Sequence, residues 1–437
     1  MQEPTIRVGI MYEEEISFQL NGTYMLQQNN KVYSGRQTIK YQKGEIEFDG
    51  FIFDSEELNF NPNNYAGGSF ELFDVTIGIK FHWERKENQT FKGSLHFLCE
   101  DDKLSAINVL KLEDYLASVI SSEMKATSSM ELLKAHAVIS RSWLMAQVLK
   151  GEAILSSEQS YQSVSESSEE LIKWYDREDH HKFDVCADDH CQRYQGITRQ
   201  SNKAVLRAIE ATKGLVLTSN GEICDARFSK CCGGVSETFE NVWEPKAHKY
   251  LQAITDGEES DLKLDLRNEA NAENWIQNSP DVFCNNSDKV ILSQILNDYD
   301  METPDFFRWE VRYTQDELSE LINRKTGKDF GKIIDLLPIE RGLSGRIIKL
   351  KIIGEKMSFL IGKELEIRKT LSESHLYSSN FILEKENNSS GFVLKGAGWG
   401  HGVGLCQIGA AVMGAKGYSH KEILLHYFIG AQLEKRY

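Results

Sequence analysis

The sequence contains no run of about 18 apolar residues, so it predicts no transmembrane helix. Its start, MQEPTIRVGI, lacks the basic residues and apolar centre of a signal peptide, which favours an intracellular protein or a mature domain whose signal has been removed. Positive charge is scarce, because 50 Lys and Arg residues stand against 66 Asp and Glu and leave a net charge of −16. This balance argues against nucleic acid and anionic membranes as general partners, and it stays compatible with a local basic cleft.

Cysteine is also rare: the 437 residues include eight, which excludes a disulfide scaffold. Internal repeats are missing, and the Ser-rich stretch SSEQSYQSVSESSEE is expected to form a loop. What is present is enough apolar residues (41%) and aromatics (10%) to bury a sizeable core. The length predicts two or three domains, or one large domain with an insertion.

The hydrophobic pattern predicts an α+β fold with a β-rich core, a helical active-site segment and an inserted subdomain. Short β-like runs such as IRVGIMY, GEIEFDGFIF and GSLHFLCE indicate a β-rich N-terminal region, residues 1–94. Residues 254–339 are charged and richer in helix formers, which indicates a subdomain inserted into a domain made of residues 95–253 and 340–437.

Two consecutive helices are predicted in the middle of the chain. Apolar residues at helical spacing predict the first over residues 105–120. The pair Ser128 and Glu131 fits a capping box at the start of the second, which is expected to run to about Lys150 and to end at Gly151.

The stretch SSEMKATSSMELLKAHAVISRSW, residues 121–143, places two cations after one acid. Lys134 and Arg141 share one helix face, and Glu123 lies in the turn before that helix. Taken alone, such a set more often forms a structural ion pair; the alternative is a general acid with cations that hold a substrate. Because close cations lower the pKa of a carboxyl group whereas a catalytic acid needs a raised one, the catalytic hypothesis requires the cations to contact substrate.

The stretch HHKFDVCADDHCQRYQG concentrates thiols and imidazoles, the ligands that zinc prefers. Cys186 and Cys191 with an upstream histidine predict a zinc site with three protein ligands. Its spacing lacks the CxxC pairs of closed structural sites, and a Cys186–Cys191 disulfide or a plain surface loop are the alternatives.

Two glycine-rich stretches follow. In DARFSKCCGGVSETFENVW, the step Cys231-Cys232-Gly233-Gly234 predicts a tight turn, and either cysteine can bridge to Cys224 or Cys284. In GAGWGHGVGLCQIGA, closely spaced glycines allow backbone to approach a ligand, but no phosphate-loop sequence follows. His401 in this stretch fits a ligand, a base or a hydrogen-bonded core histidine.

Together these stretches resemble the stage II sporulation protein D / amidase-enhancer (SpoIID/LytB) family. The family pattern of an E-M pair, a short gap and L-K-A-x-A-x-x-x-R is matched by Glu123-Met124 and by LKAHA through Arg141. FSKCCGGVSETFENVW is similar to the family's Ser/Cys-Gly-Gly segment, and GWGHGVGLCQIGAAVMGAKGYSHKEILLHYF to its C-terminal signature. The motifs span roughly residues 95–437, and their joint order is more specific than any one of them.

The resemblance implies a peptidoglycan lytic transglycosylase that cuts glycan strands between N-acetylmuramic acid and N-acetylglucosamine, preferably where stem peptides are missing. It implies Glu123 as the catalytic acid and base, and Lys134, Arg141, Lys230 and His401 as substrate-binding residues. The family's Tyr-x-Lys pattern here is Phe228-Ser229-Lys230, so the tyrosine hydroxyl is absent.

The resemblance also implies zinc near the active site, held by Cys186, Cys191 and either His181 or His180. It implies peptidoglycan as partner, together with a possible cell-wall amidase, and an exported protein of the periplasm or cell envelope whose signal is absent from this chain. In such an oxidising compartment the cysteines Cys224, Cys231, Cys232 and Cys284 are candidates for disulfides.

This hypothesis explains why one acid suffices. Ordinary glycosidases need two carboxylates, whereas in a lytic transglycosylase the C6 hydroxyl of the substrate attacks the anomeric carbon. The cations would hold the lactyl carboxylate of muramic acid. Two alternatives stay open: a non-catalytic wall-binding module that stimulates an amidase, and a zinc hydrolase that uses the Cys/His stretch directly.

Overall fold

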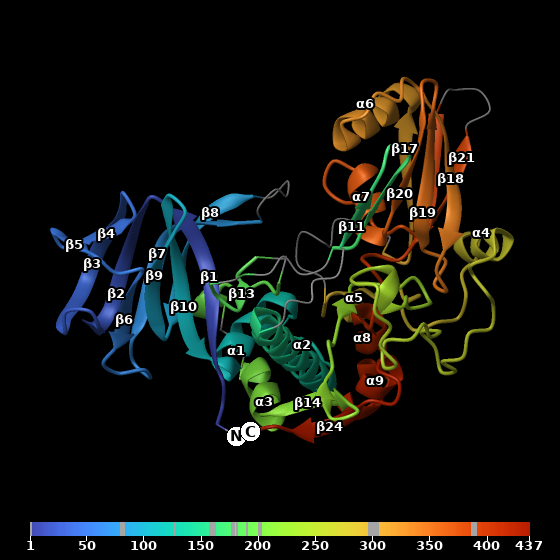
Figure 1. Cartoon of the computed structure of the whole chain (residues 1–437). Coiled ribbons are helices and arrows are strands. Elements are labelled where there is room, and N and C mark those ends of the chain that lie inside the picture. Colours follow the sequence, from blue (N-terminus) through green and yellow to red (C-terminus); the bar gives the residue numbers. More distant parts are fainter. Residues whose placement is uncertain are drawn as a thin grey trace.

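The computed structural model describes residues 2–78, 84–125, 127–156, 163–175, 180, 182–188, 191–199, 203–295, 306–385 and 391–437. Two β-rich lobes rise on either side of a helical centre, and the two termini lie side by side at the base (Figure 1). Within these residues no helix combines the length and apolar character needed to cross a membrane. The predicted α+β class with a β-rich core is confirmed.

The N-terminal lobe is a large, mostly antiparallel sheet. Its strands alternate buried and exposed residues, as a sheet with one packed face requires. The strands are β1 (Thr5–Glu13), β2 (Glu15–Leu26), β3 (Lys31–Gln42), β4 (Glu45–Phe48), β5 (Phe51–Phe53), β6 (Glu57–Pro62), β7 (Ser69–Ile77), β8 (Arg85–Lys92), β9 (Ser94–Glu100), β10 (Lys103–Lys111) and β13 (Val185–Cys186). Their order is β13-β1-β10-β9-β6-β2-β3-β4-β5, with β7 paired to β2 and β8.

The helix predicted over residues 105–120 is wrong for its first part and correct from Leu112 onward. Residues up to Lys111 form strand β10, which lies between β1 and β9, and helix α1 begins at Leu112 and ends at Glu123. Most residues of β10 are buried, five of them in succession, so it shows no alternation that would mark it as a strand. The sheet therefore continues past the predicted boundary at residue 94 and leads directly into the helix that carries Glu123.

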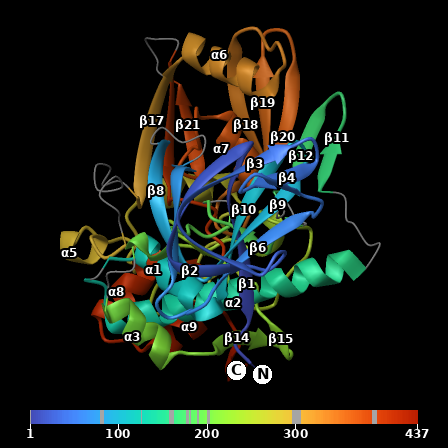
Figure 2. The same cartoon turned by 90° about the vertical axis from the view of Figure 1, so that its left-hand side faces the viewer.

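Helix α2 (Met130–Ser156) crosses the base of the molecule (Figure 2). It does not end at Gly151, since an isolated glycine costs a helix only about 1 kcal/mol. The predicted capping box is also wrong: the Ser129 hydroxyl accepts the Leu132 N–H, and Glu131 binds other partners. Ser128 instead donates its hydroxyl to the Gln294 carbonyl oxygen.

Smaller elements surround α2 and complete the first hydrophobic core. The helices are α3 (Lys203–Ala211), α5 (Lys289–Leu292), α8 (Gln407–Ala415) and α9 (His420–Tyr427), with 3-10 turns at Gly196–Arg199 and Phe239–Asn241. Helix α4 (Glu269–Gln277) instead lies against strands β21 (Phe381–Lys385) and β22 (Gly391–Ala397) of the second lobe. The strands are β14 (Leu215–Ser219), β15 (Glu222–Ile223) and β24 (Gln432–Lys435) in one sheet, and β16 (Phe228–Ser229) with β23 (Leu405–Cys406) in another.

The second lobe has a hydrophobic core of its own, formed by residues between Trp309 and Leu394. Helices α6 (Gln315–Thr326) and α7 (Glu364–Thr370) lie against two sheets. One sheet has the order β11-β12-β20-β19-β18 and the other β17-β22-β21. The strands are β11 (Val164–Glu166), β12 (Glu170–Lys173), β17 (Arg308–Thr314), β18 (Ile333–Arg341), β19 (Ile347–Gly354), β20 (Ser358–Gly362), β21 (Phe381–Lys385) and β22 (Gly391–Ala397).

The two cores suggest domain boundaries that differ from the sequence-based ones. Ile254, Phe283 and Ile295 belong to the first core, together with the N-terminal sheet and the helices. We propose that the inserted subdomain covers about residues 306–397, and that residues 254–295 are part of the domain into which it is inserted.

Candidate active site and metal clusters

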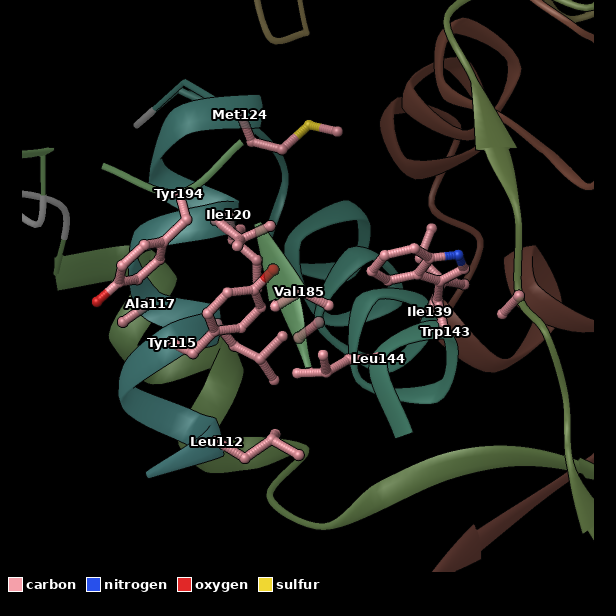
Figure 3. Packing of buried hydrophobic residues seen from close by; sticks show 14 of the residues in the cluster. Leu112, Tyr115, Ala117, Ile120, Met124, Ile139, Trp143, Leu144, Val185 and Tyr194 are labelled. Carbon is pink, nitrogen blue, oxygen red and sulfur yellow. The ribbon is translucent and has the colours of Figure 1, made fainter. Parts of the chain in front are cut away.

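Glu123 is the last residue of α1, and the sequence of this helix explains its position. Apolar residues on the core-facing side pack α1 against α2 and β13, and the chain becomes extended at the buried Met124, which ends the helix (Figure 3). The Glu123 side chain is half-buried. Among the described residues, none forms a hydrogen bond or ion pair with its carboxylate, so the cations of α2 do not neutralise it.

Tyr115, two turns earlier on α1, connects Glu123 electrostatically with the predicted zinc ligands. Its ring stacks on Tyr194 with 5.1 Å between ring centres (Figure 3). Burial raises the pKa of Tyr115 well above its usual value, and the charges of Cys191 and Cys186 add to this effect. The charge of Glu123 adds to it as well.

Lys134 is engaged within the chain. Its ammonium group lies 2.7 Å from Glu131 Oε1, and the other oxygen of Glu131 accepts the ring Nδ1 and backbone N–H of His420. Burial alone would raise the pKa of Glu131, but the hydrogen bonds from Lys134 and His420 lower it to about 2. Lys134 remains partly exposed (22%), which leaves its charge accessible to an anion.

Arg141 is fully buried, which differs from the position expected of a substrate-binding cation. Its guanidinium forms a two-pronged ion pair with the Glu113 carboxylate, at 3.0 and 2.7 Å. It also donates to the carbonyl oxygens of Ala137 and Leu215. This closed environment favours the structural ion pair that the sequence left open, and it links α1, α2 and β14.

Lys230 lies near the turn that follows Glu123. The Lys230 ammonium group donates to the Ile295 carbonyl oxygen at 2.9 Å, while the neighbouring Gln294 accepts the backbone N–H groups of Lys125 and Ser129. Residues 294–295 therefore join the turn between α1 and α2 to the segment that carries Lys230.

His136 is a fully buried residue close enough to Lys230 to sense its charge. Its ring lies edge-on to Phe228, with 4.8 Å between ring centres, and its nitrogens contact Ser140 and Gln407. Burial, together with the charge of Lys230, lowers the pKa of His136 to about 3. His136 is therefore neutral at physiological pH and adds no second positive charge beside Lys230.

His401 is partly exposed, and its ring also contacts the protein. Its Nδ1 accepts the Val403 N–H at 3.0 Å, and its ring lies edge-on to Trp243. Burial, together with the charge of Arg227, lowers the pKa of His401 well below its usual value.

The stretch predicted to bind zinc does bring three ligand types together. His180, Cys186 and Cys191 form the His/Cys cluster, with their ligand atoms within 4.8 Å of one another. Cys191 Sγ and His180 Nε2 are 3.5 Å apart, close to the distance of about 3.3–3.8 Å between neighbouring ligands of tetrahedral zinc. His181, the other candidate ligand, lies outside the described residues, and Cys186 and Cys191 do not form the alternative disulfide.

A second cluster was not predicted from the sequence. Cys232, Asp256, Cys284 and Cys406 form the Cys/Asp cluster, in which four fully buried ligand atoms lie within 4.8 Å of one another, so this cluster could bind a metal. The disulfides considered for Cys224, Cys231, Cys232 and Cys284 are not formed, since none of the eight cysteines takes part in a disulfide. No spacing motif could have revealed the cluster, because its members are up to 174 residues apart; the predicted Cys-Cys-Gly-Gly turn, with positive φ at both glycines, was the available signal.

Comparisons with known proteins agree with the motifs. Residues 100–219 match the family described as "Stage II sporulation protein", and residues 237–404 match a domain of unknown function (DUF8618). An uncharacterized protein of Brachyspira hyodysenteriae is 25% identical over 423 residues, which are 97% of this chain and 85% of that protein. Stage II sporulation protein D of Bacillus subtilis is 22% identical, over 86% of this chain and 90% of its own length.

A further relative is the amidase enhancer of Bacillus subtilis, which is 26% identical over 55% of this chain and 34% of that protein. These similarities support a function related to the cell wall. They also confirm the resemblance to the SpoIID/LytB family that the sequence motifs indicated.

Proposed function

We propose that the protein is a peptidoglycan lytic transglycosylase that acts in the cell envelope. The observation that carries this proposal is the half-buried Glu123 carboxyl group, which closes α1 without an ion-pair partner among the described residues. A carboxyl group that is not held by a cation can exchange its proton with a substrate. The match to the stage II sporulation family over residues 100–219 supports the assignment, since it includes Glu123.

In this proposal, Glu123 acts first as acid and then as base. It donates a proton to the glycosidic oxygen as the bond to the anomeric carbon of N-acetylmuramic acid breaks. The C6 hydroxyl of the same sugar attacks that carbon and returns its proton to Glu123. The products are a 1,6-anhydromuramic end and a free N-acetylglucosamine end, so no second carboxylate is required to activate water.

The cations take different roles. Lys230 is the preferred partner for the lactyl carboxylate, because its ammonium group contacts the Ile295 carbonyl oxygen and so lies near the turn after Glu123. Lys134 already shares Glu131 with His420, so it contributes a weaker positive field. Arg141 positions α1 against α2 and does not contact substrate. The preference for glycan without stem peptides follows, since only there is the lactyl carboxylate free.

We also propose zinc at the His/Cys cluster, held by Cys186, Cys191 and His180 or His181. The mixture of thiols and imidazole and the short distances between them fit this metal. When bound, zinc would fix Cys186 and Cys191 in place near Tyr115. The chemistry at the glycosidic bond needs no contribution from it.

The test is a digest of purified glycan, with and without stem peptides, analysed by mass spectrometry. The chain should release anhydromuramic products, Glu123→Gln should abolish them, and the exposed control Glu210→Gln on α3 should retain them. Glycan binding should be nearly unchanged in Glu123→Gln. Hydrated reducing ends would contradict a transglycosylase, and full cleavage by Glu123→Gln would contradict the assignment of the acid.

A second candidate is a non-catalytic module that stimulates a cell-wall amidase. It is favoured by the burial of Arg141, which leaves fewer cations for substrate, and by the similarity to an amidase enhancer. If neither glycan is cleaved while the chain accelerates an added amidase, this second function would replace the first.

A further inference from the structure

The Cys/Asp cluster is fully enclosed at the centre of the first core. The relative exposure of its four side chains is 0–1%. Cys232 Sγ and Cys284 Sγ are 3.6 Å apart, beyond a disulfide bond and within the distance between two ligands of one metal ion. A carboxylate among three thiols has no role in a disulfide, whereas it completes a four-ligand set for a cation.

Neighbouring groups already orient the ligand atoms. The Asp256 carboxylate accepts the Tyr427 hydroxyl at one oxygen (2.6 Å) and the Cys284 backbone N–H at the other (3.0 Å). Cys406 Sγ accepts the backbone N–H of Cys232 at 3.3 Å. Such hydrogen bonds to carboxylate and sulfur hold metal ligands in place and are as much a part of a metal site as the ligands.

The backbone around the cluster is also adapted to close approach. Gly233 and Gly234 follow Cys232 with φ of 81° and 105°, conformations that favour glycine. A Cβ at Gly409, in the first turn of α8, would overlap the Asp256 carboxylate and the Tyr427 hydroxyl. The fold therefore leaves no room for larger residues at the positions that bring the four ligands together.

We propose that Cys232, Asp256, Cys284 and Cys406 bind one zinc ion in a closed, structural site. Three thiolates and one carboxylate satisfy tetrahedral zinc without an open position for water. Cys231, also fully buried, interacts with Cys284 and Cys406 and supports the site from one side. This site is separate from the His/Cys cluster and does not depend on the proposed enzymatic function.

The site would connect segments that are remote in the sequence. Cys232 follows β16, and Cys406 ends β23, which pairs with β16. Asp256 and Cys284 come from the long loops that flank α4 and precede the second lobe. One zinc ion would thus join Cys284, which precedes the inserted subdomain, to Cys406, which follows it. Through Cys232 it would also hold the segment that carries Lys230.

The experiment measures zinc in the purified full-length chain by elemental analysis. In the Cys186→Ser/Cys191→Ser background, which removes the His/Cys cluster, we expect about one zinc per chain. Adding Cys284→Ser should remove nearly all of it. Adding Cys224→Ser, a matched change at a buried cysteine outside the cluster, should leave it unchanged.

Two measurements keep the proposal testable if Cys284→Ser does not fold. Asp256→Asn keeps the three thiols, so the chain should bind zinc more weakly against a competing chelator. Cobalt added to metal-depleted chain in the same background should give the sulfur charge-transfer absorption of tetrahedral cobalt thiolate. A Cys232–Cys284 disulfide in protein purified without reductant, iron in place of zinc, or a chain free of metal in that background would each overturn the proposal.

Discussion

The ion pair between Arg141 and Glu113 allows two hypotheses for Arg141 to be distinguished: a structural ion pair and a substrate-binding cation. We expect Arg141→Met to lower the free energy of unfolding by about 3–5 kcal/mol, because it leaves a largely buried carboxylate without its partner. Urea unfolding followed by circular dichroism measures this loss.

The double variant Arg141→Met/Glu113→Gln serves as control. It removes both charges, keeps an acceptor for the Tyr437 hydroxyl, and should recover part of the lost stability. If Arg141→Met instead kept its stability and lost glycan binding, Arg141 would be a substrate-binding residue after all.

Glu131 is expected to contribute to the loss of stability at low pH. Its hydrogen bonds with Lys134 and His420 lower its pKa from 4.5 to about 2 in the folded chain. Its stabilising contribution is therefore complete above about pH 4.5 and is lost as the pH falls towards 2. After allowance for solvent screening, we expect the wild-type chain to lose about 1 kcal/mol more than Glu131→Gln across that range.

Urea titrations of both chains at pH 5.5 and pH 3 measure this difference, with Glu210→Gln as an exposed control. Equal losses for the wild-type chain and for Glu131→Gln would show that the Lys134–Glu131–His420 contacts do not contribute to acid sensitivity.

Two glycines within helices should respond in opposite ways to the same substitution. Gly151→Ala in α2 places its methyl group in open space and should raise the free energy of unfolding by up to about 1 kcal/mol, since alanine favours helix. Gly409→Ala in α8 forces a methyl group against Asp256 and Tyr427 and should lower it by about 1–3 kcal/mol. Thermal unfolding of the two variants, side by side, measures the difference. A harmless Gly409→Ala would show that α8 can shift away from the Cys/Asp cluster.

The described residues form two large hydrophobic cores and a small third cluster of Ile276, Ile382 and Ala397, and we expect the two large cores to unfold as two units. We expect calorimetry to give two transitions, or a calorimetric enthalpy above the van't Hoff value. Leu116→Ala and Leu350→Ala, each at a fully buried position of one core, should cost about 2–5 kcal/mol and lower the transition of that core alone. If both variants lower one common transition, the lobes are coupled into a single cooperative unit.

The sequence by itself determined the features that depend on neighbours in the chain. Alternating residues specified the N-terminal strands, and the apolar spacing from Leu112 to Val119 specified α1, because these patterns follow from the geometry of strand and helix. The short spacing of Cys186 and Cys191 was sufficient to predict the His/Cys cluster, since one loop supplies all its ligands. The family motifs occur in this sequence in the family's order, and they indicated the resemblance that the comparisons confirmed.

The tertiary structure decided what depends on partners remote in the sequence. Residues 105–111 became a strand because β1 and β9 offer backbone partners on both sides. Arg141 found Glu113, 28 residues away, and was buried with it. The Cys/Asp cluster exists only because folding brings together four residues separated by 24, 28 and 122 positions. Local spacing carries no record of such contacts, since their geometry arises from the packing of whole elements.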